Sequence, residues 1–136
     1  MLIDNDLNEL SRLGEWISAW TSQHTIPDAT AGYVDLCATE AVTNVMTHAY
    51  DDAATHQIAL RLERDGDRVR LLIEDDGKAF DPTAVVPPAP ATLQNERIGG
   101  WGISIIRRLT EKLTYKRSDG RNHLTLVFRA RSQGAT

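Results

Sequence analysis

Residues 29–50 contain the pattern that most constrains the fold, a run of apolar side chains at helical spacing. Side chains three and four positions apart lie on one face of an α-helix, so this run predicts a helix with one core-facing stripe. The stripe consists of Val34, Ala38, Ala41, Val42, Val45 and Ala49. The spacing therefore assigns one side of this helix to the protein core.

A second stripe on the same helix is polar. Glu40, Asn44 and His48 recur every four residues, and this spacing turns them by only about 80° in total around the axis. Two interpretations are open: the stripe faces solvent, or it faces a ligand. Solvated faces usually carry lysine and arginine, yet positions 33–49 hold neither, and asparagine is a poor helix former in a helix interior. Both details favour the interpretation that the polar stripe faces a ligand.

Glu40 and Asn44 together suggest a specific chemistry. A carboxylate can accept a proton from an attacking hydroxyl group, and an amide oxygen one turn away can ligate Mg²⁺. The pair would thus place one base and one metal ligand on a rigid scaffold. Phosphoryl transfer needs that arrangement.

The rest of the chain alternates helices with pairs of strands. Helices are expected at residues 6–23 and 101–113, and strands at residues 57–63, 68–74, 114–117 and 123–130. Asp65-Gly66 and Ser118-Asp119-Gly120 lie between paired strands and are typical of hairpin turns. This order predicts an α+β fold, a two-layer sandwich with helices on one face of a mixed sheet.

Composition excludes several classes of protein. The 136 residues suit one domain spanning 1–136, with 41% hydrophobic and 25% charged residues. The formal net charge of −4 argues against a nucleic-acid or anionic-membrane binder. No apolar run approaches the roughly 18 residues of a membrane span, and the first ten residues do not resemble a signal peptide. Cys37 is the single cysteine, which indicates a reducing cytoplasm.

Glycine turns flank a long irregular segment. Asp75 and Gly77 follow an expected strand, and Gly99, Gly100 and Gly102 open the third helix, where free N–H groups can bind an anion, with Arg97 just upstream. Between them, residues 80–98 are rich in proline and lack helical or strand periodicity. A loop of this length predicts a lid hinged by glycines, with plain disorder as the alternative.

These motifs resemble those of a known family. EAVTNVMTHAY looks like the N box of the GHKL (Bergerat) ATP-binding fold, DDGKAFDP resembles its first glycine box, and GGWGISIIRRL resembles its second. The closer resemblance is to the small bacterial anti-sigma factor serine kinases of the SpoIIAB and RsbW type. It covers residues 6–130, and the combined order of the motifs is highly specific.

The resemblance implies a function and roles for individual residues. Glu40 would be the general base and Asn44 the Mg²⁺ ligand, while Asp75 would hydrogen-bond the adenine amino group and Gly77 would let the base approach. Gly99, Gly100 and Gly102 would hold the lid and the phosphates of ATP. Members of this family phosphorylate a serine on a small antagonist protein, bind or release a sigma factor, and commonly form homodimers.

Two departures from the family pattern bear on these expectations. Ala79 stands where the first glycine box usually has its second glycine, which could narrow the space beside the nucleotide, and the N-terminal strand is expected to be short or absent. His48 matches the family pattern but receives no catalytic role. A non-catalytic nucleotide-sensing module that sequesters a partner is therefore the main alternative to the kinase. A fragment of a sensor histidine kinase and a gyrase-type ATPase fit less well, since neither a phosphoacceptor helix pair nor a transducer domain is recognisable.

Overall fold

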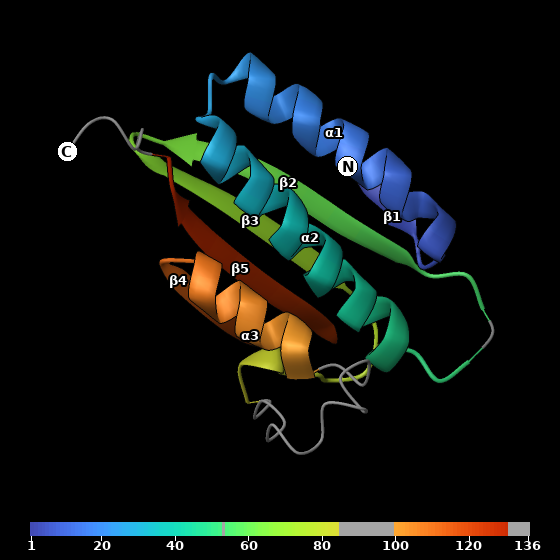
Figure 1. Ribbon diagram of the computed structural model, residues 1–136. Helices are drawn as coiled ribbons and strands as arrows, with labels where there is room; N and C mark the ends of the chain where they lie inside the picture. The colour runs from blue at the N-terminus through green and yellow to red at the C-terminus, as the bar shows by residue number, and fades with distance from the viewer. Residues whose placement is uncertain (53, 85–99, 131–136) are drawn as a thin grey trace.

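The computed structural model describes residues 1–52, 54–84 and 100–130 and contains one antiparallel sheet (Figure 1). Its strands are β1 (Leu2–Asp4), β2 (Gln57–Asp65), β3 (Arg68–Asp75), β4 (Lys112–Ser118) and β5 (Arg121–Arg129). They lie in the order β1-β2-β3-β5-β4, and each neighbouring pair of these strands is antiparallel. The sheet is therefore not the mixed one expected from the sequence. β4 runs parallel to β3, but β5 lies between them and pairs antiparallel with both.

Two tight turns set the register of the sheet. In the β2–β3 hairpin Asp65 pairs with Arg68, and Gly66 in the two-residue turn has a φ of 60°. In the β4–β5 hairpin both turn residues, Asp119 and Gly120, have positive φ, as a type I′ turn requires. The hairpins expected at both glycines are confirmed.

In the described part of the chain, three α-helices cover one face of the sheet (Figure 1). They are α1 (Leu10–Gln23), α2 (Asp28–His48) and α3 (Gly100–Leu109), and the short 3-10 helices are η1 (Leu7–Glu9) and η2 (Pro82–Ala84). The α+β class with helices on one face is thus confirmed. None of the helices in the described residues is long and apolar enough to cross a membrane.

The core lies between this helical layer and the sheet. All six side chains of the expected apolar stripe of α2 are buried: Val34, Ala38, Ala41, Val42, Val45 and Ala49. The inward positions of β3 and β5 meet them, and Leu71, Ile73, Leu126 and Phe128 are each at most 2% exposed. The core therefore fixes which side of α2 faces the sheet and which remains for the polar stripe.

The end of the third helix differs from the sequence-based expectation, whereas the N-terminal strand is as short as expected. The third helix was expected to reach residue 113 but ends at Leu109, and the Thr110 hydroxyl donates to the Ile106 carbonyl at 2.7 Å. Leu113 instead belongs to β4 and pairs with Leu126. An apolar residue four positions after Leu109 fits a helical face as well as an inward strand position, so local spacing could not separate the two. At the N-terminus a three-residue strand, β1, is present.

Candidate functional site

The polar stripe of α2 is only partly open to solvent. Asn44 is 7% exposed, and Glu40 and His48 are half-buried. The Asn44 amide nitrogen Nδ2 is buried without a hydrogen-bond partner in the described part of the chain. A buried amide left unpaired costs about 1–3 kcal/mol. Asn44 therefore carries a polar group that the described part of the folded chain does not satisfy.

The first turn of α3 packs closely against Glu40 and Asn44. A Cβ atom at Gly102 would lie 2.8 Å from Glu40 Oε2 and 3.6 Å from Asn44 Nδ2. Glycine at this position therefore keeps the space around the carboxylate and the amide clear. Gly100 is the first residue of α3, while Arg97 and Gly99, together with most of the expected lid, lie outside the described residues.

The turn after β3 is held tightly against the end of α2. Asp75 is 2% exposed, and its Oδ1 accepts a hydrogen bond of 2.9 Å from the Gly77 backbone N–H. A Cβ atom at Gly77 would lie 2.5 Å from the Ala49 carbonyl oxygen, and the Lys78 N–H donates to that same oxygen at 2.8 Å. The glycine is thus required by packing of the turn on α2, and close approach of a nucleotide base is not needed to explain it.

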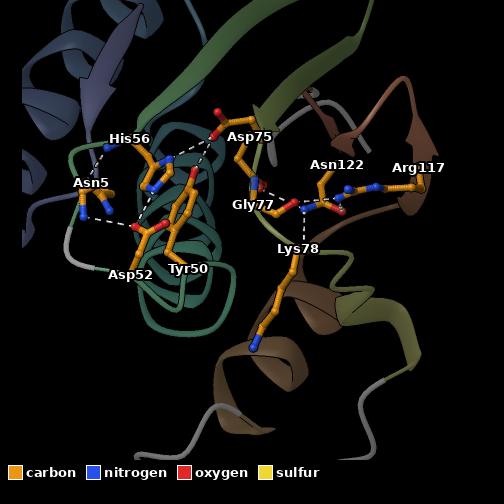
Figure 2. A network of polar contacts seen from close by, with 11 residues as sticks. Asn5, Tyr50, Asp52, His56, Asp75, Gly77, Lys78, Arg117 and Asn122 are labelled. Atoms are coloured by element: carbon orange, nitrogen blue, oxygen red, sulfur yellow. Dashed lines mark hydrogen bonds and ion pairs between the residues drawn. The ribbon is translucent and has the colours of Figure 1, made fainter.

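Asn122 joins this turn to β5, a role that the sequence pattern did not predict. Its Nδ2 donates to Asp75 Oδ1 and to the Lys78 carbonyl, each at 2.9 Å, and Figure 2 shows the side chain directed at the turn. The signal was available: Asn122 is a polar residue in the inward register that Leu124, Leu126 and Phe128 otherwise keep apolar. It was missed because the strand was expected to begin at His123.

Asn44, Asp75 and Asn122 line one pocket between the helices and the sheet. Its lining consists of Ala41, Asn44, Val45, Ile73, Asp75, Phe80, Pro82, Ile103, Tyr115, Asn122 and Leu124. Most of these side chains are apolar, and three supply amide or carboxyl groups from α2, β3 and β5. An apolar pocket with a few converging polar groups is typical of a ligand site, but its open volume is about 20 Å³, so lining side chains would have to move to admit a purine base.

Two positions singled out in the sequence lie near this pocket without a demonstrated role. The His48 ring stacks on Phe80, a lining residue, with ring centroids 5.3 Å apart. Ala79 is exposed and does not belong to the lining. Its methyl group therefore does not line this pocket, and the expected effect of Ala79 beside a bound nucleotide stays a prediction.

Burial controls the titration of two side chains beside the site. Burial, with a smaller contribution from the charge of Glu40, raises the pKa of the Cys37 thiol to about 12. The thiol is thus protonated at neutral pH and unsuited to act as a nucleophile. The pKa of Tyr50 is also raised, first by burial and then by the charges of Asp75 and Asp76.

A second polar cluster holds the α2–β2 connection beside the turn. His56 stacks on Tyr50 with ring centroids 4.2 Å apart, and its Nε2 lies 2.7 Å from Asp52 Oδ1 (Figure 2). Its Nδ1 lies 3.5 Å from Asp76 Oδ1. The hydrogen bond to Asp52 is the main reason why the pKa of His56 is raised and that of Asp52 lowered.

The described residues contain no group of three or more His, Cys, Asp or Glu side chains able to hold a metal ion. Mg²⁺ in phosphoryl-transfer enzymes is commonly held by one or two protein oxygen ligands, with phosphates and water completing the octahedron. The unpaired atom of Asn44 is the Nδ2 donor, which can bond a phosphate oxygen but cannot ligate Mg²⁺, so the Asn44 amide oxygen, on the side chain beside the Glu40 carboxylate, is the atom that would hold the ion.

Comparison with known proteins assigns the class. Residues 3–128 match the family model described as the histidine kinase-like ATPase domain, so the chain belongs to this family.

Among individual proteins, the chain is 41% identical over 93 residues to the serine/threonine-protein kinase BtrW of Bordetella bronchiseptica, covering 68% of this chain and 66% of BtrW. It is 30% identical over 92 residues to the serine-protein kinase RsbW of Halalkalibacterium halodurans, covering 64% of this chain and 56% of that protein. The chain thus spans less than two thirds of the length of these curated relatives.

Solved structures share the fold at lower sequence identity. The RsbU and RsbW domains of a Mycobacterium tuberculosis protein give a TM-score of 0.63 at 18% identity, covering 95% of this chain and 32% of that one. SiaB in the SiaB–SiaC complex of Pseudomonas aeruginosa gives a TM-score of 0.57 at 17% identity, covering 94% of this chain and 88% of that one. These likenesses support the fold and do not by themselves assign an activity.

Proposed function

We propose that this chain is an ATP-dependent protein serine kinase that acts as an anti-sigma factor. The observation that carries the proposal is the buried Asn44 Nδ2 group beside Glu40 and the first turn of α3, a donor that has no partner among the described residues and that a phosphate oxygen would satisfy. A folded protein tolerates such a group most readily where a ligand completes its bonding. The chain belongs to the histidine kinase-like ATPase family, and it is similar to a serine/threonine-protein kinase and to a serine-protein kinase. Both findings support phosphoryl transfer from ATP to a serine as the class of reaction.

Each candidate residue has a defined task in this proposal. Glu40 accepts the proton of the substrate serine hydroxyl as the serine oxygen attacks the γ-phosphorus of ATP, and the bond from that phosphorus to the bridging oxygen breaks so that ADP leaves. Asp75 accepts a hydrogen bond from the adenine amino group, and Gly77 keeps the turn that carries Asp75 against α2. Asn44 would hold Mg²⁺, which when bound neutralises charge on the phosphates. Gly99, Gly100 and Gly102 with Arg97 would bind the phosphates at the start of α3.

The partners follow from the same class of protein. We propose a small antagonist protein as the phosphate acceptor and a sigma factor as the second partner, with binding switched by phosphorylation of the antagonist. A cytoplasmic homodimer built from one domain, residues 1–136, belongs to the same proposal.

Nucleotide binding is the first test. Calorimetric titration with Mg-ATP, Mg-ADP and Mg-GTP should show binding of the two adenine nucleotides and preference over GTP. Failure to bind Mg-ATP at millimolar concentration would rule out both hypotheses, the serine kinase and the nucleotide-sensing module.

Transfer is the second test. A tagged Glu40→Gln variant, used to capture the antagonist from native cytoplasm, provides the acceptor for an assay with labelled ATP. Wild-type protein should transfer label to serine, and Glu40→Gln should bind ATP normally while transferring at least a hundredfold more slowly. Glu15→Gln, the same change on the exposed face of α1, should transfer at the wild-type rate. Tight ATP binding by wild-type protein without any transfer would leave the sensing module as the function.

A further inference from the structure

We infer that Asn122 is a positioning residue for Asp75 and thereby sets the preference of the pocket for adenine over guanine. The inference rests on the proposed nucleotide site and adds to it a residue on β5. Asn122 lies 47 positions along the chain from Asp75, but β3 and β5 pair these two residues directly in the sheet register. Both side chains are buried, with 4% and 2% of their surface exposed.

The Asn122 amide has only one possible orientation. Its two N–H groups donate to Asp75 Oδ1 and to the Lys78 carbonyl, both of which are obligate acceptors. Its Oδ1 accepts from the Arg117 guanidinium at 3.1 Å, and a guanidinium can only donate. Exchanging the amide oxygen and nitrogen would break all three contacts, so the network defines the assignment.

Asp75 is consequently held from one side only. Its Oδ1 receives two donors from the protein, the Gly77 N–H and Asn122 Nδ2, each at 2.9 Å. Its Oδ2 receives no hydrogen bond from the described part of the chain, and Asp75 lines the pocket. The carboxyl group is thus fixed in rotation, with one oxygen used by the fold and the other left for a ligand.

Strand β4 reinforces the arrangement from the opposite direction. The Tyr115 hydroxyl donates to Asn122 Oδ1, and Arg117 donates to the Gly77 carbonyl at 2.7 Å in addition to Asn122. Figure 2 shows Arg117 reaching across Asn122 to the turn. The β4–β5 hairpin and the turn after β3 are therefore joined at the carbonyl of Gly77, at the side chain of Asp75 and at the carbonyl of Lys78.

A fixed carboxylate oxygen distinguishes the two purines. It accepts a hydrogen bond from the exocyclic amino group of adenine, whereas guanine presents a carbonyl oxygen at the same ring position. Discrimination between adenine and guanine is strong only when the Asp75 carboxylate cannot rotate. A fixed carboxylate oxygen that faces the guanine carbonyl oxygen has no hydrogen-bond donor, and this loss disfavours guanine. By preventing rotation of Asp75, Asn122 makes the hydrogen bond between Asp75 and the base selective for adenine over guanine.

The experiment measures dissociation constants of Mg-ATP and Mg-GTP for wild type, Asn122→Ala and Tyr115→Phe. Asn122→Ala should weaken ATP binding by about tenfold or more and bring the ATP-to-GTP preference close to one. Tyr115→Phe keeps the ring and removes one donor to Asn122, so it should shift the same ratio by a smaller factor. Circular dichroism and thermal melting verify that each variant is folded.

Thr30→Val is the matched structural control. Thr30 is also 4% exposed, and its hydroxyl donates to the Arg129 carbonyl at 2.9 Å, at the opposite end of β5 from Asn122. The control should lower the melting temperature and leave the ATP-to-GTP preference unchanged. A role of Asn122 confined to stability would give the same outcome as this control.

The outcomes separate the inference from the proposed function. Wild-type protein that binds no Mg-ATP overturns both. Wild-type protein that prefers ATP, together with folded Asn122 and Tyr115 variants that retain the full preference, overturns the inference alone. If Asn122→Ala does not fold, an unchanged ratio in Tyr115→Phe is sufficient to reject it.

Discussion

The same dipeptide, Asp-Gly, flanks strand β3 on both sides, as Asp65-Gly66 and Asp76-Gly77, in opposite environments. At the hairpin end, Gly66 has a φ of 60°, and a Cβ atom there would meet nothing within 4 Å. At the pocket end, a Cβ atom on Gly77 would overlap the Ala49 carbonyl oxygen at 2.5 Å. One glycine is required by backbone conformation and the other by lack of space.

The polar groups at the two ends differ in the same way. Near the hairpin, Arg68 forms ion pairs with Asp67 and Glu111 on the molecular surface, and such exposed pairs contribute little to stability. Near the pocket, Asp75 and Asn122 are buried and bond to each other. The comparison teaches that one short motif can terminate a hairpin or shape a binding site, depending on what packs against it.

The pocket end should be far more sensitive to a single methyl group. Gly77→Ala forces the turn away from α2, and overpacking of this kind costs about 3 kcal/mol. Urea unfolding should report that loss, and ATP binding should fall with it because Asp75 moves with the turn. An unchanged midpoint of urea unfolding would show that the turn can shift freely. The contrast in packing between Gly77 and Gly66 would then be wrong.

The unpaired Asn44 amide allows a second test at the pocket. Replacing it by leucine removes a buried polar group without a partner, so Asn44→Leu should raise the free energy of unfolding by about 2 kcal/mol while abolishing Mg-ATP binding. The contrasting change is Thr30→Val, which removes a buried hydroxyl that does have a partner and should destabilise. A destabilised Asn44→Leu variant would argue that the amide is satisfied within the fold.

The hairpin end should respond more weakly. Gly66→Ala places a Cβ atom in the left-handed region, which costs about 1 kcal/mol, and there is open space around it. Nucleotide affinity should not change, because the substitution lies at the far end of β3. Measuring unfolding and ATP titration side by side with Gly77→Ala gives the direct comparison.

The smallest effect concerns pH. The pKa of His56 is raised in the fold by its hydrogen bond to Asp52 and the nearby charge of Asp76, so the folded state binds the proton more tightly than the unfolded chain. The stabilisation is complete below the ordinary histidine pKa of about 6.5 and is lost as pH rises through the raised value. The difference in melting temperature between wild type and His56→Gln should therefore be largest near pH 6 and should shrink towards pH 9.

Local pattern was sufficient for some features and misleading for others. The core stripe of α2 and both hairpins followed from spacing and turn residues alone. The end of α3 did not, because Leu113 fits a helix or a strand and only its pairing with Leu126 decides between them. The roles of Glu40, Asn44 and Asp75 remain predictions, although the structure places these residues around the same small region.

The sequence by itself determined the two faces of α2, the α+β class and the order of the motifs, since periodicity and turn chemistry act between close neighbours in the chain. Only the tertiary structure decided that Asn122 bonds to Asp75 and that Gly77 lies against Ala49. Those contacts depend on the register between β3 and β5 and on the position of α2 over the sheet. The burial of apolar surface from distant segments sets both, and no local pattern encodes it.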